Sequence, residues 1–347
     1  MCIYFGNGSE LTYETQEHVI PAALGCCTKL EKGVVSDGAN KYFSPIERDV
    51  LEHSFIQIPR IIKGPGKRGK LSTKYATTSE VSVIEHDGFK CLGYMKGTEG
   101  YILSQFIIDN TNKISFMWQQ DTDNNAQAEI QKLKSHISEM GEKYVPVNID
   151  GDDSGSVFVT YFKDKIHIGY TGELSEIKVN EIKKLFSGSL NTGNSSSVYG
   201  QIRASLEITE DFVKLGKVIA KTAINTLAYI IDAKYIMDSP DFNELIEMTL
   251  SDDDKILTKV NSIKDALAMK QHLHLSEEQH SCLITRNGKE LRALVFFYER
   301  CFEVILCKNL SKPFLFPIEG VVCDWKNRKD YRYLDYLTKI GVLTKNQ

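Results

Sequence analysis

The sequence predicts an α+β protein in which a small N-terminal module is followed by a larger mixed domain with a C-terminal antiparallel sheet. Segments with strand character alternate with segments of helical period, as expected for this class. Residues 209–231 form the strongest predicted helix, because apolar side chains recur along a broad face. Asn287-Gly288 separates two apolar runs near the C-terminus, which is a strong signal for a two-residue hairpin.

The middle of the chain predicts short strands and one amphipathic helix. The apolar runs within 79–108 are short and strand-like. Residues 123–142 predict a helix, because apolar residues recur three or four positions apart: Ile130, Leu133, Ile137 and Met140. The run VFVTYFKDKIHIGY predicts a hairpin with its turn near Lys163–Lys165. The Ser-, Gly- and Asn-rich run at 187–200 predicts a flexible loop or linker.

The C-terminal part predicts two further helices, at 239–250 and 255–271, before the chain returns to β structure. We expect this C-terminal sheet to pack against the helix at 209–231. The predicted organisation is therefore a finger with a basic loop at 1–78 and an α+β accessory domain at 79–347. The loop at 187–200 is a candidate division within the accessory domain.

The composition excludes several classes of protein. The formal net charge of -4, from 42 Lys+Arg and 46 Asp+Glu, excludes a histone-like polycation but not a local basic patch. The hydrophobic content of 42% is too high for a disordered chain. Eight scattered cysteines favour reduced thiols over a disulfide framework. No signal peptide and no apolar run of roughly 20 residues is visible, so we expect a cytoplasmic protein without a membrane partner.

The chemically informative stretch is Thr12–Pro59, where acidic, imidazole and amide side chains follow one another at short spacings. Glu17 directly precedes His18, and Asn40 and further acidic groups come later. Phosphodiester hydrolysis needs such a set, because a carboxylate holds a hard divalent cation and a His activates water. A second metal ligand from another element then fixes the cation in place.

The order TYETQEHVIPAALG followed by GANKYFSPIERDVL resembles the HNH endonuclease family, in the branch that carries the pattern E-H-x-x-P-x-x-L-G. The resemblance covers only this early part of the chain. It implies a ββα-metal finger in which His18 is the general base and Glu17 a metal ligand. It also implies that Asn40 braces the loop of the finger.

The second metal ligand is left open by the resemblance. Asp49 lies at the spacing after Asn40 that the family commonly uses, and is favoured. Glu47 is the close alternative, and His53 is the third. Oxygen ligands of this kind fit Mg2+ or Mn2+ best.

Two CxxC pairs that bind a structural zinc are common in this branch, and this chain departs from them. The first pair reads Cys2-Ile3-Tyr4-Phe5 and the second reads Ser36-Asp37-Gly38-Ala39, so one of four thiols remains. Phe, Ser and Ala cannot replace three sulfur ligands, and the adjacent Cys26 and Cys27 are a poor substitute. We therefore expect no structural zinc, and a finger held by apolar packing with Phe5 near the position of the lost metal.

A basic segment follows the finger. No acidic residue occurs between His53 and Ser79, and three glycines within the segment allow close approach of a phosphate backbone. Cationic side chains neutralise phosphates and release counterions. The segment therefore predicts nucleic-acid contacts at Arg60, Lys63, Lys67, Arg68, Lys70 and Lys74.

These features together predict a metal-dependent HNH-type endonuclease that hydrolyses phosphodiester bonds in nucleic acid, with DNA as the expected partner. The layout resembles prokaryotic defence nucleases, in which a C-terminal region responds to a protein or small-molecule regulator. The alternative is a catalytically degenerate HNH-like module that binds nucleic acid or senses a ligand. The oligomeric state stays open, a homodimer included.

Overall fold

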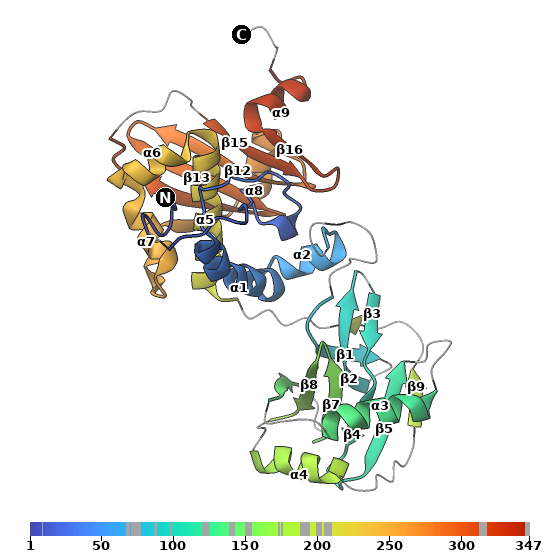
Figure 1. The fold of residues 1–347 in the computed structure, drawn as a ribbon. Helices are drawn as coiled ribbons and strands as arrows, with labels where there is room; N and C mark the ends of the chain where they lie inside the picture. The colour runs from blue at the N-terminus through green and yellow to red at the C-terminus, as the bar shows by residue number, and fades with distance from the viewer. Residues whose placement is uncertain are drawn as a thin grey trace. The chain divides into compact units, whose positions relative to one another are not determined.

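The computed structural model describes residues 1–8, 10–66, 70, 78–86, 89–97, 99–119, 125–138, 143–149, 155–172, 174, 176–187, 195–198, 203–204, 210–311 and 318–343. The chain divides into two compact units (Figure 1). Unit 1 combines Met1–Thr77 with Ile208–Gln347, and unit 2 is Thr78–Glu207. Helices and sheets occur in both units, which confirms the predicted α+β class.

A six-stranded antiparallel sheet in the order β11-β14-β13-β12-β15-β16 forms one layer of unit 1. A two-residue hairpin joins its strands β12 and β13, as predicted, but its loop residues are Gly288 and Lys289 instead of Asn287-Gly288, because Asn287 pairs with Glu290 and Gly288 has the positive φ of 60°. The C-terminal antiparallel sheet is therefore confirmed. Its strands are β11 (Val260–Ile263), β12 (Gln279–Asn287), β13 (Glu290–Phe297), β14 (Arg300–Cys307), β15 (Ile318–Asp324) and β16 (Lys329–Arg332).

Helix α5 (Phe212–Ile230) is the centre of the core of unit 1. Asp211 caps its N-terminus by accepting a hydrogen bond from the Lys214 N–H, and every residue from Leu215 to Ala228 is buried. A helix that is buried all round needs cover on all sides. The sheet covers one side of α5, as predicted, and N-terminal residues cover another (Figure 1).

The N-terminal residues contribute a short 3-10 helix, η1 (Ala22–Leu24), and two helices, α1 (Asp37–His53) and α2 (Gln57–Ile62). Helix α1 packs against α5 and buries Ala39, Phe43 and Val50 in the shared core. The finger region and the C-terminal sheet therefore belong to one hydrophobic core.

Shorter elements complete unit 1. They are α6 (Ala233–Asp238), η4 (Pro240–Phe242), α7 (Asn243–Leu250), η5 (Asp254–Thr258), α8 (Ala266–His272) and α9 (Tyr333–Lys339). The predicted helix at 239–250 is present as η4 and α7. The prediction at 255–271 is wrong in its middle, because Val260–Ile263 pairs with β14 as an edge strand. No helix in the described stretches is long and apolar enough to cross a bilayer.

Unit 2 contains two sheets, in the orders β10-β1-β2-β3 and β6-β8-β7-β4-β5-β9, with helices α3 (Ala126–Ser138) and α4 (Glu176–Ser187). The predicted helix is confirmed as α3, while Met140 lies outside the described residues. The predicted hairpin is β7–β8, with its turn at Lys163 and Asp164. The strands are β1 (Ser82–His86), β2 (Phe89–Lys96), β3 (Glu99–Ile102), β4 (Gln105–Ile108), β5 (Ile114–Gln119), β6 (Val145–Asn148), β7 (Val157–Phe162), β8 (Lys165–Tyr170), β9 (Ser195–Val198) and β10 (Arg203–Ala204).

The division of the chain differs from the predicted split into 1–78 and 79–347. Residues 208–347 return to the N-terminal residues, because α5 and the sheet supply the apolar surface on which the finger folds. Unit 2 is thus an insertion within unit 1. The loop predicted at 187–200 includes strand β9 at Ser195–Val198, and 188–194 and 199–200 lie beyond the described residues.

Candidate functional site

The region around Glu17 and His18 consists of an extended segment, a tight return and a helix. His18 forms an isolated antiparallel bridge with Lys29, and the segment between them contains η1. Helix α1 then begins after Ser36, whose side chain accepts a hydrogen bond from the Ala39 N–H. An extended segment that carries the Glu17-His18 pair is therefore followed by a return through η1 and then by helix α1.

Asp37 ties the loop that precedes Glu17 to the start of α1. Its carboxylate accepts hydrogen bonds from the Glu14 N–H at 2.8 Å and from the Thr15 N–H and hydroxyl at 2.9 and 2.6 Å. The bond with Thr15 is the main reason that the pKa of Asp37 lies well below its usual range. Asn40 adds a bond from its Nδ2 to the Thr15 hydroxyl at 2.9 Å. Asn40 thus helps to hold this loop next to the start of α1.

The positions of the two degenerate CxxC pairs lie next to each other. The Cys2 thiol accepts hydrogen bonds from the Ser36 N–H and hydroxyl, each at 3.3 Å. Cys2 also bridges Gly6 in a tight turn. Phe5 is 40% exposed and packs edge-on against Tyr42, so it does not fill a buried void as we expected. Hydrogen bonds between Cys2 and Ser36 join the two segments instead.

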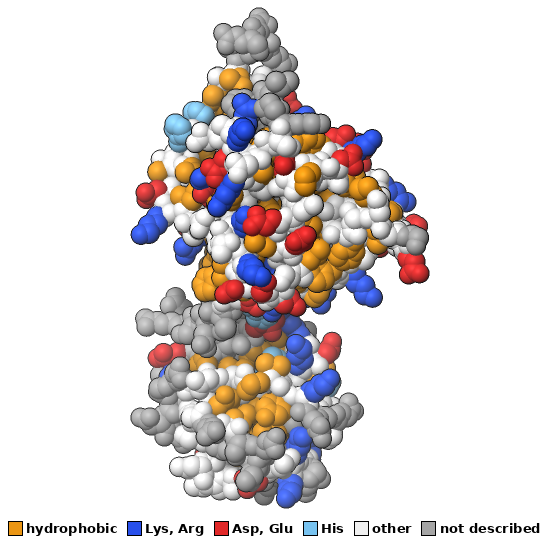
Figure 2. Space-filling model, turned by 90° about the vertical axis from the view of Figure 1, so that its left-hand side faces the viewer, with side chains coloured by type: hydrophobic (Ala, Val, Ile, Leu, Met, Phe, Trp, Pro, Cys, Tyr) orange, Lys and Arg blue, Asp and Glu red, His pale blue; other side chains and the backbone are white. Residues whose placement is uncertain are grey.

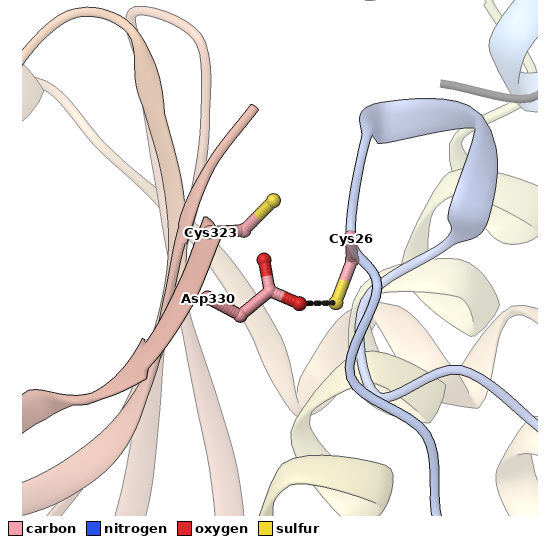
Figure 3. A group of neighbouring side chains, drawn as sticks. All are labelled: Cys26, Cys323 and Asp330. Carbon is pink, nitrogen blue, oxygen red and sulfur yellow. Dashed lines mark hydrogen bonds between the residues drawn. The ribbon is translucent and has the colours of Figure 1, made fainter. Parts of the chain in front are cut away.

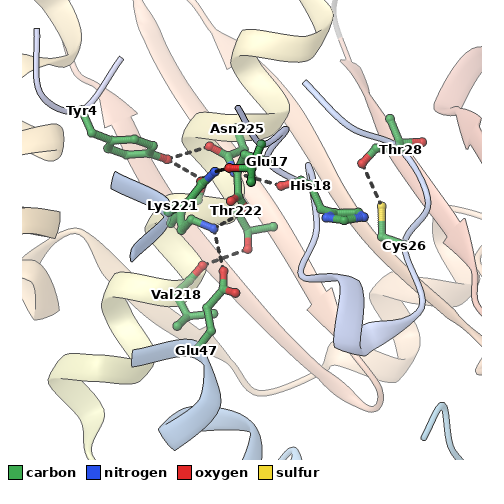
Figure 4. Close-up of polar contacts among 12 residues, drawn as sticks. Tyr4, Glu17, His18, Cys26, Thr28, Glu47, Val218, Lys221, Thr222 and Asn225 are labelled. Atoms are coloured by element: carbon green, nitrogen blue, oxygen red, sulfur yellow. Dashed lines mark hydrogen bonds and ion pairs between the residues drawn. The ribbon is translucent and has the colours of Figure 1, made fainter. Parts of the chain in front are cut away.

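A lysine from α5 lies between two of the predicted metal ligands (Figure 4). Lys221 Nζ is 2.6 Å from an oxygen of Glu17 and 2.6 Å from an oxygen of Glu47. The side chains of Lys221, Glu17 and Glu47 are only 3%, 13% and 19% exposed. The two carboxylates therefore converge on one cation position, and an ammonium group occupies it.

Lys221 and Asn225, two residues of α5, hold the Glu17-His18 segment together with buried aromatic neighbours. Its ammonium lies 5.4 Å from the centre of the Phe43 ring. The Tyr4 hydroxyl donates to Asn225 Oδ1 at 2.7 Å, and Asn225 Nδ2 donates to the His18 carbonyl at 3.0 Å. Helix α5 therefore holds both residues of the Glu17-His18 pair, one through its side chain and one through its backbone.

The electrostatics of this cluster favour a charged lysine. Burial disfavours the ammonium, but the carboxylates of Glu47 and Glu17 outweigh burial and raise the pKa of Lys221. Burial raises the pKa of Glu47, and the nearby Glu17 adds to this, while Lys221 opposes it. One ammonium thus balances two close carboxylates in a site shielded from water.

The His18 side chain points away from this cation position. Adjacent residues in an extended segment point to opposite sides, so Glu17 faces Lys221 while the His18 ring lies toward Cys26 and Thr28 (Figure 4). Burial lowers the pKa of His18, which keeps the imidazole neutral at neutral pH. The predicted general base and the predicted metal ligands therefore lie on different sides of the same segment.

Asp49 and His53 do not join Glu17. The Asp49 carboxylate accepts a hydrogen bond from Lys214 Nζ at 2.9 Å. It also lies 3.1 Å from His53 Nδ1, on another face of α1 than Glu47. Residues two apart on a helix point in different directions, so Glu47 and Asp49 cannot both face Glu17. The preference for Asp49 over Glu47 as the partner of Glu17 was therefore wrong.

The basic segment differs from a free phosphate-binding loop. Arg60 is 6% exposed within α2, so it is not a surface contact as predicted. Lys63 donates to Glu299 at 2.8 Å, which compensates its charge. Lys70 is exposed, while Lys67, Arg68 and Lys74 lie outside the described part of the chain. Acidic and basic side chains are interspersed on the face of unit 1 seen in Figure 2.

The sequence analysis missed Lys221 and Asn225. A signal was present, because Lys217 and Lys221 interrupt an otherwise apolar helix one turn apart. A lysine in a buried helix needs an acidic partner. Nothing in the local sequence, however, says which acidic residue that is.

Comparisons with known proteins leave this geometry as the main source of information about function. No family model matches the chain, and neither a curated protein nor a solved structure shows significant similarity to it.

Proposed function

We propose that this protein carries an HNH-like finger that binds nucleic acid without hydrolysing it. The observation that carries the proposal is the position of Lys221 Nζ, 2.6 Å from both Glu17 and Glu47. A divalent cation and an ammonium group cannot share this position, because both need the same oxygens and repel each other. The built-in ammonium replaces the catalytic metal in this interpretation.

Because Lys221 occupies Glu17 and Glu47, the site would lack the Lewis acid that HNH-type hydrolysis needs. Mg2+ or Mn2+ would have to displace Lys221 before Glu17 and Glu47 could coordinate it. Displacement would leave a buried ammonium without its two carboxylates, which is a large penalty. The His18 ring also points away from the position at which the metal would activate water.

The exposed face of α1 offers a surface for phosphate groups. Lys41, Ser44 and Arg48 are exposed and spaced three to four residues apart, so they lie along one side of the helix. Cationic and hydroxyl side chains on one helix face are suited to a nucleic-acid backbone, which they contact without reading sequence.

Binding and cleavage assays with the full chain test the proposal. Fluorescence anisotropy with labelled single-stranded DNA, duplex DNA and RNA should detect salt-dependent binding. The Lys41→Ala/Arg48→Ala variant should bind more weakly and reduce the slope of log K against log salt by about 2. The matched Lys264→Ala/Lys289→Ala variant removes two exposed cations elsewhere and should bind like the parent. Equal weakening in both double variants would contradict a site on α1.

A metal-dependent HNH-type endonuclease is the second candidate, favoured by the convergence of Glu17 and Glu47 on one cation position. Incubation of each nucleic acid with Mg2+ or Mn2+ separates the two candidates. We expect no cleavage by the parent. Cleavage that is lost in both Glu17→Gln and His18→Ala would establish the nuclease instead. Direct Mn2+ binding by electron paramagnetic resonance should be absent in the parent and appear in Lys221→Ala.

A further inference from the structure

Two buried thiols and a carboxylate meet where the N-terminal finger contacts the C-terminal sheet (Figure 3). Ligand atoms of Cys26, Cys323 and Asp330 all lie within 4.8 Å of one another. Cys26 comes from the loop after η1, Cys323 from β15 and Asp330 from β16. The cluster lies on the side of the Glu17-His18 segment opposite Lys221, so it is separate from the position that Lys221 fills.

The register of the sheet builds half of this cluster. Cys323 and Asp330 are directly paired across β15 and β16, so their side chains share one face of the sheet. The finger brings the third group. Gly25 has a φ of 94°, and a Cβ atom there would lie 2.6 Å from the Trp325 Cβ. The absence of a side chain at Gly25 therefore lets the loop carrying Cys26 approach the strand.

The two oxygens of Asp330 have different surroundings. Oδ2 accepts from the Cys27 N–H at 2.7 Å and from the Thr28 N–H and hydroxyl at 2.5 and 2.8 Å, and lies 3.4 Å from the Cys26 sulfur. Oδ1 is buried and has no hydrogen-bond partner among the residues that the structure describes. A buried carboxylate oxygen without a partner costs free energy, and a cation beside it would remove that cost.

We propose that Cys26, Cys323 and Asp330 bind a zinc ion, with His18 as the candidate fourth ligand. Zinc accepts thiolate, carboxylate and imidazole ligands, whereas Mg2+ and Ca2+ prefer oxygen alone. Tetrahedral zinc places two sulfur ligands about 3.8 Å apart and a sulfur and an oxygen about 3.6 Å apart. The three ligand atoms lie within 4.8 Å of one another and would close toward these values on binding.

The charges and the surrounding bonds fit such an ion. Zinc binds cysteine as thiolate, so binding would release thiol protons from Cys26 and Cys323 into solution. The N–H and hydroxyl groups of Cys27 and Thr28 on Oδ2 would orient the carboxylate while Oδ1 faces the ion. The His18 ring lies on the Cys26 side of the finger (Figure 4). It is outside the group of ligand atoms within 4.8 Å of one another, so it would have to move toward them to become the fourth ligand.

Metal titrations of the full chain under reducing conditions test the site. Co2+ in place of zinc should give the near-ultraviolet charge-transfer absorption of thiolate ligands, with one ion per chain. Cys26→Ser and Cys323→Ser should weaken zinc binding by roughly 100-fold, and Asp330→Asn and His18→Ala by at least about tenfold. Cys27→Ser changes the neighbouring exposed thiol and should bind zinc like the parent.

Alkylation of the parent protein provides a readout that needs no variant to fold. Zinc should slow the modification of Cys26 and Cys323, mapped by peptide mass spectrometry, and leave that of Cys27 unchanged. The proposal is overturned if the parent shows no thiolate absorption with Co2+ or if zinc protects neither cysteine. Unchanged binding by His18→Ala would overturn the assignment of the fourth ligand.

Discussion

Lys221 Nζ lies 2.6 Å from a carboxylate oxygen of Glu17, although 204 residues separate the two in the sequence. The contact places a permanent positive charge from α5 where the resemblance to HNH nucleases expects a divalent cation. The Lys221 ammonium therefore has two roles. It balances the charges of Glu17 and Glu47, and it joins the finger to α5.

Replacing Lys221 with Met should strongly destabilise unit 1. The change leaves Glu17 and Glu47 close together and without their counter-charge, which typically costs about 3–5 kcal/mol. Lys217→Met is the matched control, one turn earlier on the same helix. Lys217 pairs with Asp252, whose side chain is 97% exposed and can return to water, so we expect a loss of about 1 kcal/mol. Urea denaturation measures both, and similar losses would contradict a special role for Lys221.

Gly25→Ala should destabilise the contact between the finger and the sheet. The new Cβ would combine a left-handed backbone with a clash against the Trp325 backbone and Cβ, for a total of about 2–4 kcal/mol. Gly33→Ala is the control, because Gly33 has a φ of 101° but open space around it. Its expected cost is about 1 kcal/mol from the backbone alone. Thermal unfolding of both variants should separate the cost of the steric clash from the cost of the left-handed backbone. Equal shifts in Tm would argue against close contact at Gly25.

The buried Lys270 should make stability depend on alkaline pH. Burial lowers the pKa of Lys270 to about 8 from an ordinary value of 10.5. The folded state therefore binds fewer protons than the unfolded chain between these values, so stability rises with pH across the window. Relative to Lys270→Met, the parent should gain about 2–3 kcal/mol of unfolding free energy between pH 7 and pH 10. Denaturation curves at a series of pH values measure this, and parallel pH profiles would show that the lysine titrates normally.

Restoring the missing thiols should restore a zinc site at the base of the finger. Cys2 and Ser36 already lie within 3.3 Å, so Phe5→Cys/Ser36→Cys/Ala39→Cys would place four thiols on the two adjoining segments. The triple variant should bind one more zinc ion per chain than the parent, measured by metal analysis after gel filtration. Ser36→Cys alone supplies only two thiols and should bind no additional ion. No gain in the triple variant would weaken the resemblance to the HNH finger.

Local pattern was sufficient for the elements whose signal lies within one segment. The face of α5, the presence of a hairpin between β12 and β13 and the apolar period of α3 each follow from neighbouring residues. The helix expected at 255–271 failed because Val260–Ile263 is a short segment whose state depends on its partner strand. The domain division failed for a related reason, since the sequence does not show that residues 208–347 return to the finger.

The candidate site shows the same limit more sharply. Spacing allowed Glu47 or Asp49 as the partner of Glu17, and only the direction from which α5 approaches selects Glu47. Cys26 and Cys323 come together through tertiary packing alone, so no local pattern predicts that they lie close together. Arg60 was wrongly predicted to contact nucleic acid, because a run of basic residues in a sequence does not show which of its side chains are buried.

The insertion of unit 2 within unit 1 has a consequence for biosynthesis. The finger is translated before unit 2, but α5 and the strands that cover the finger are translated only after the whole of unit 2. Until then, apolar residues such as Val19, Ile20 and Leu24 lack the surface that buries them. Nascent chains should therefore depend on chaperones until synthesis passes β15, and unit 2 should be the first part to gain resistance to protease.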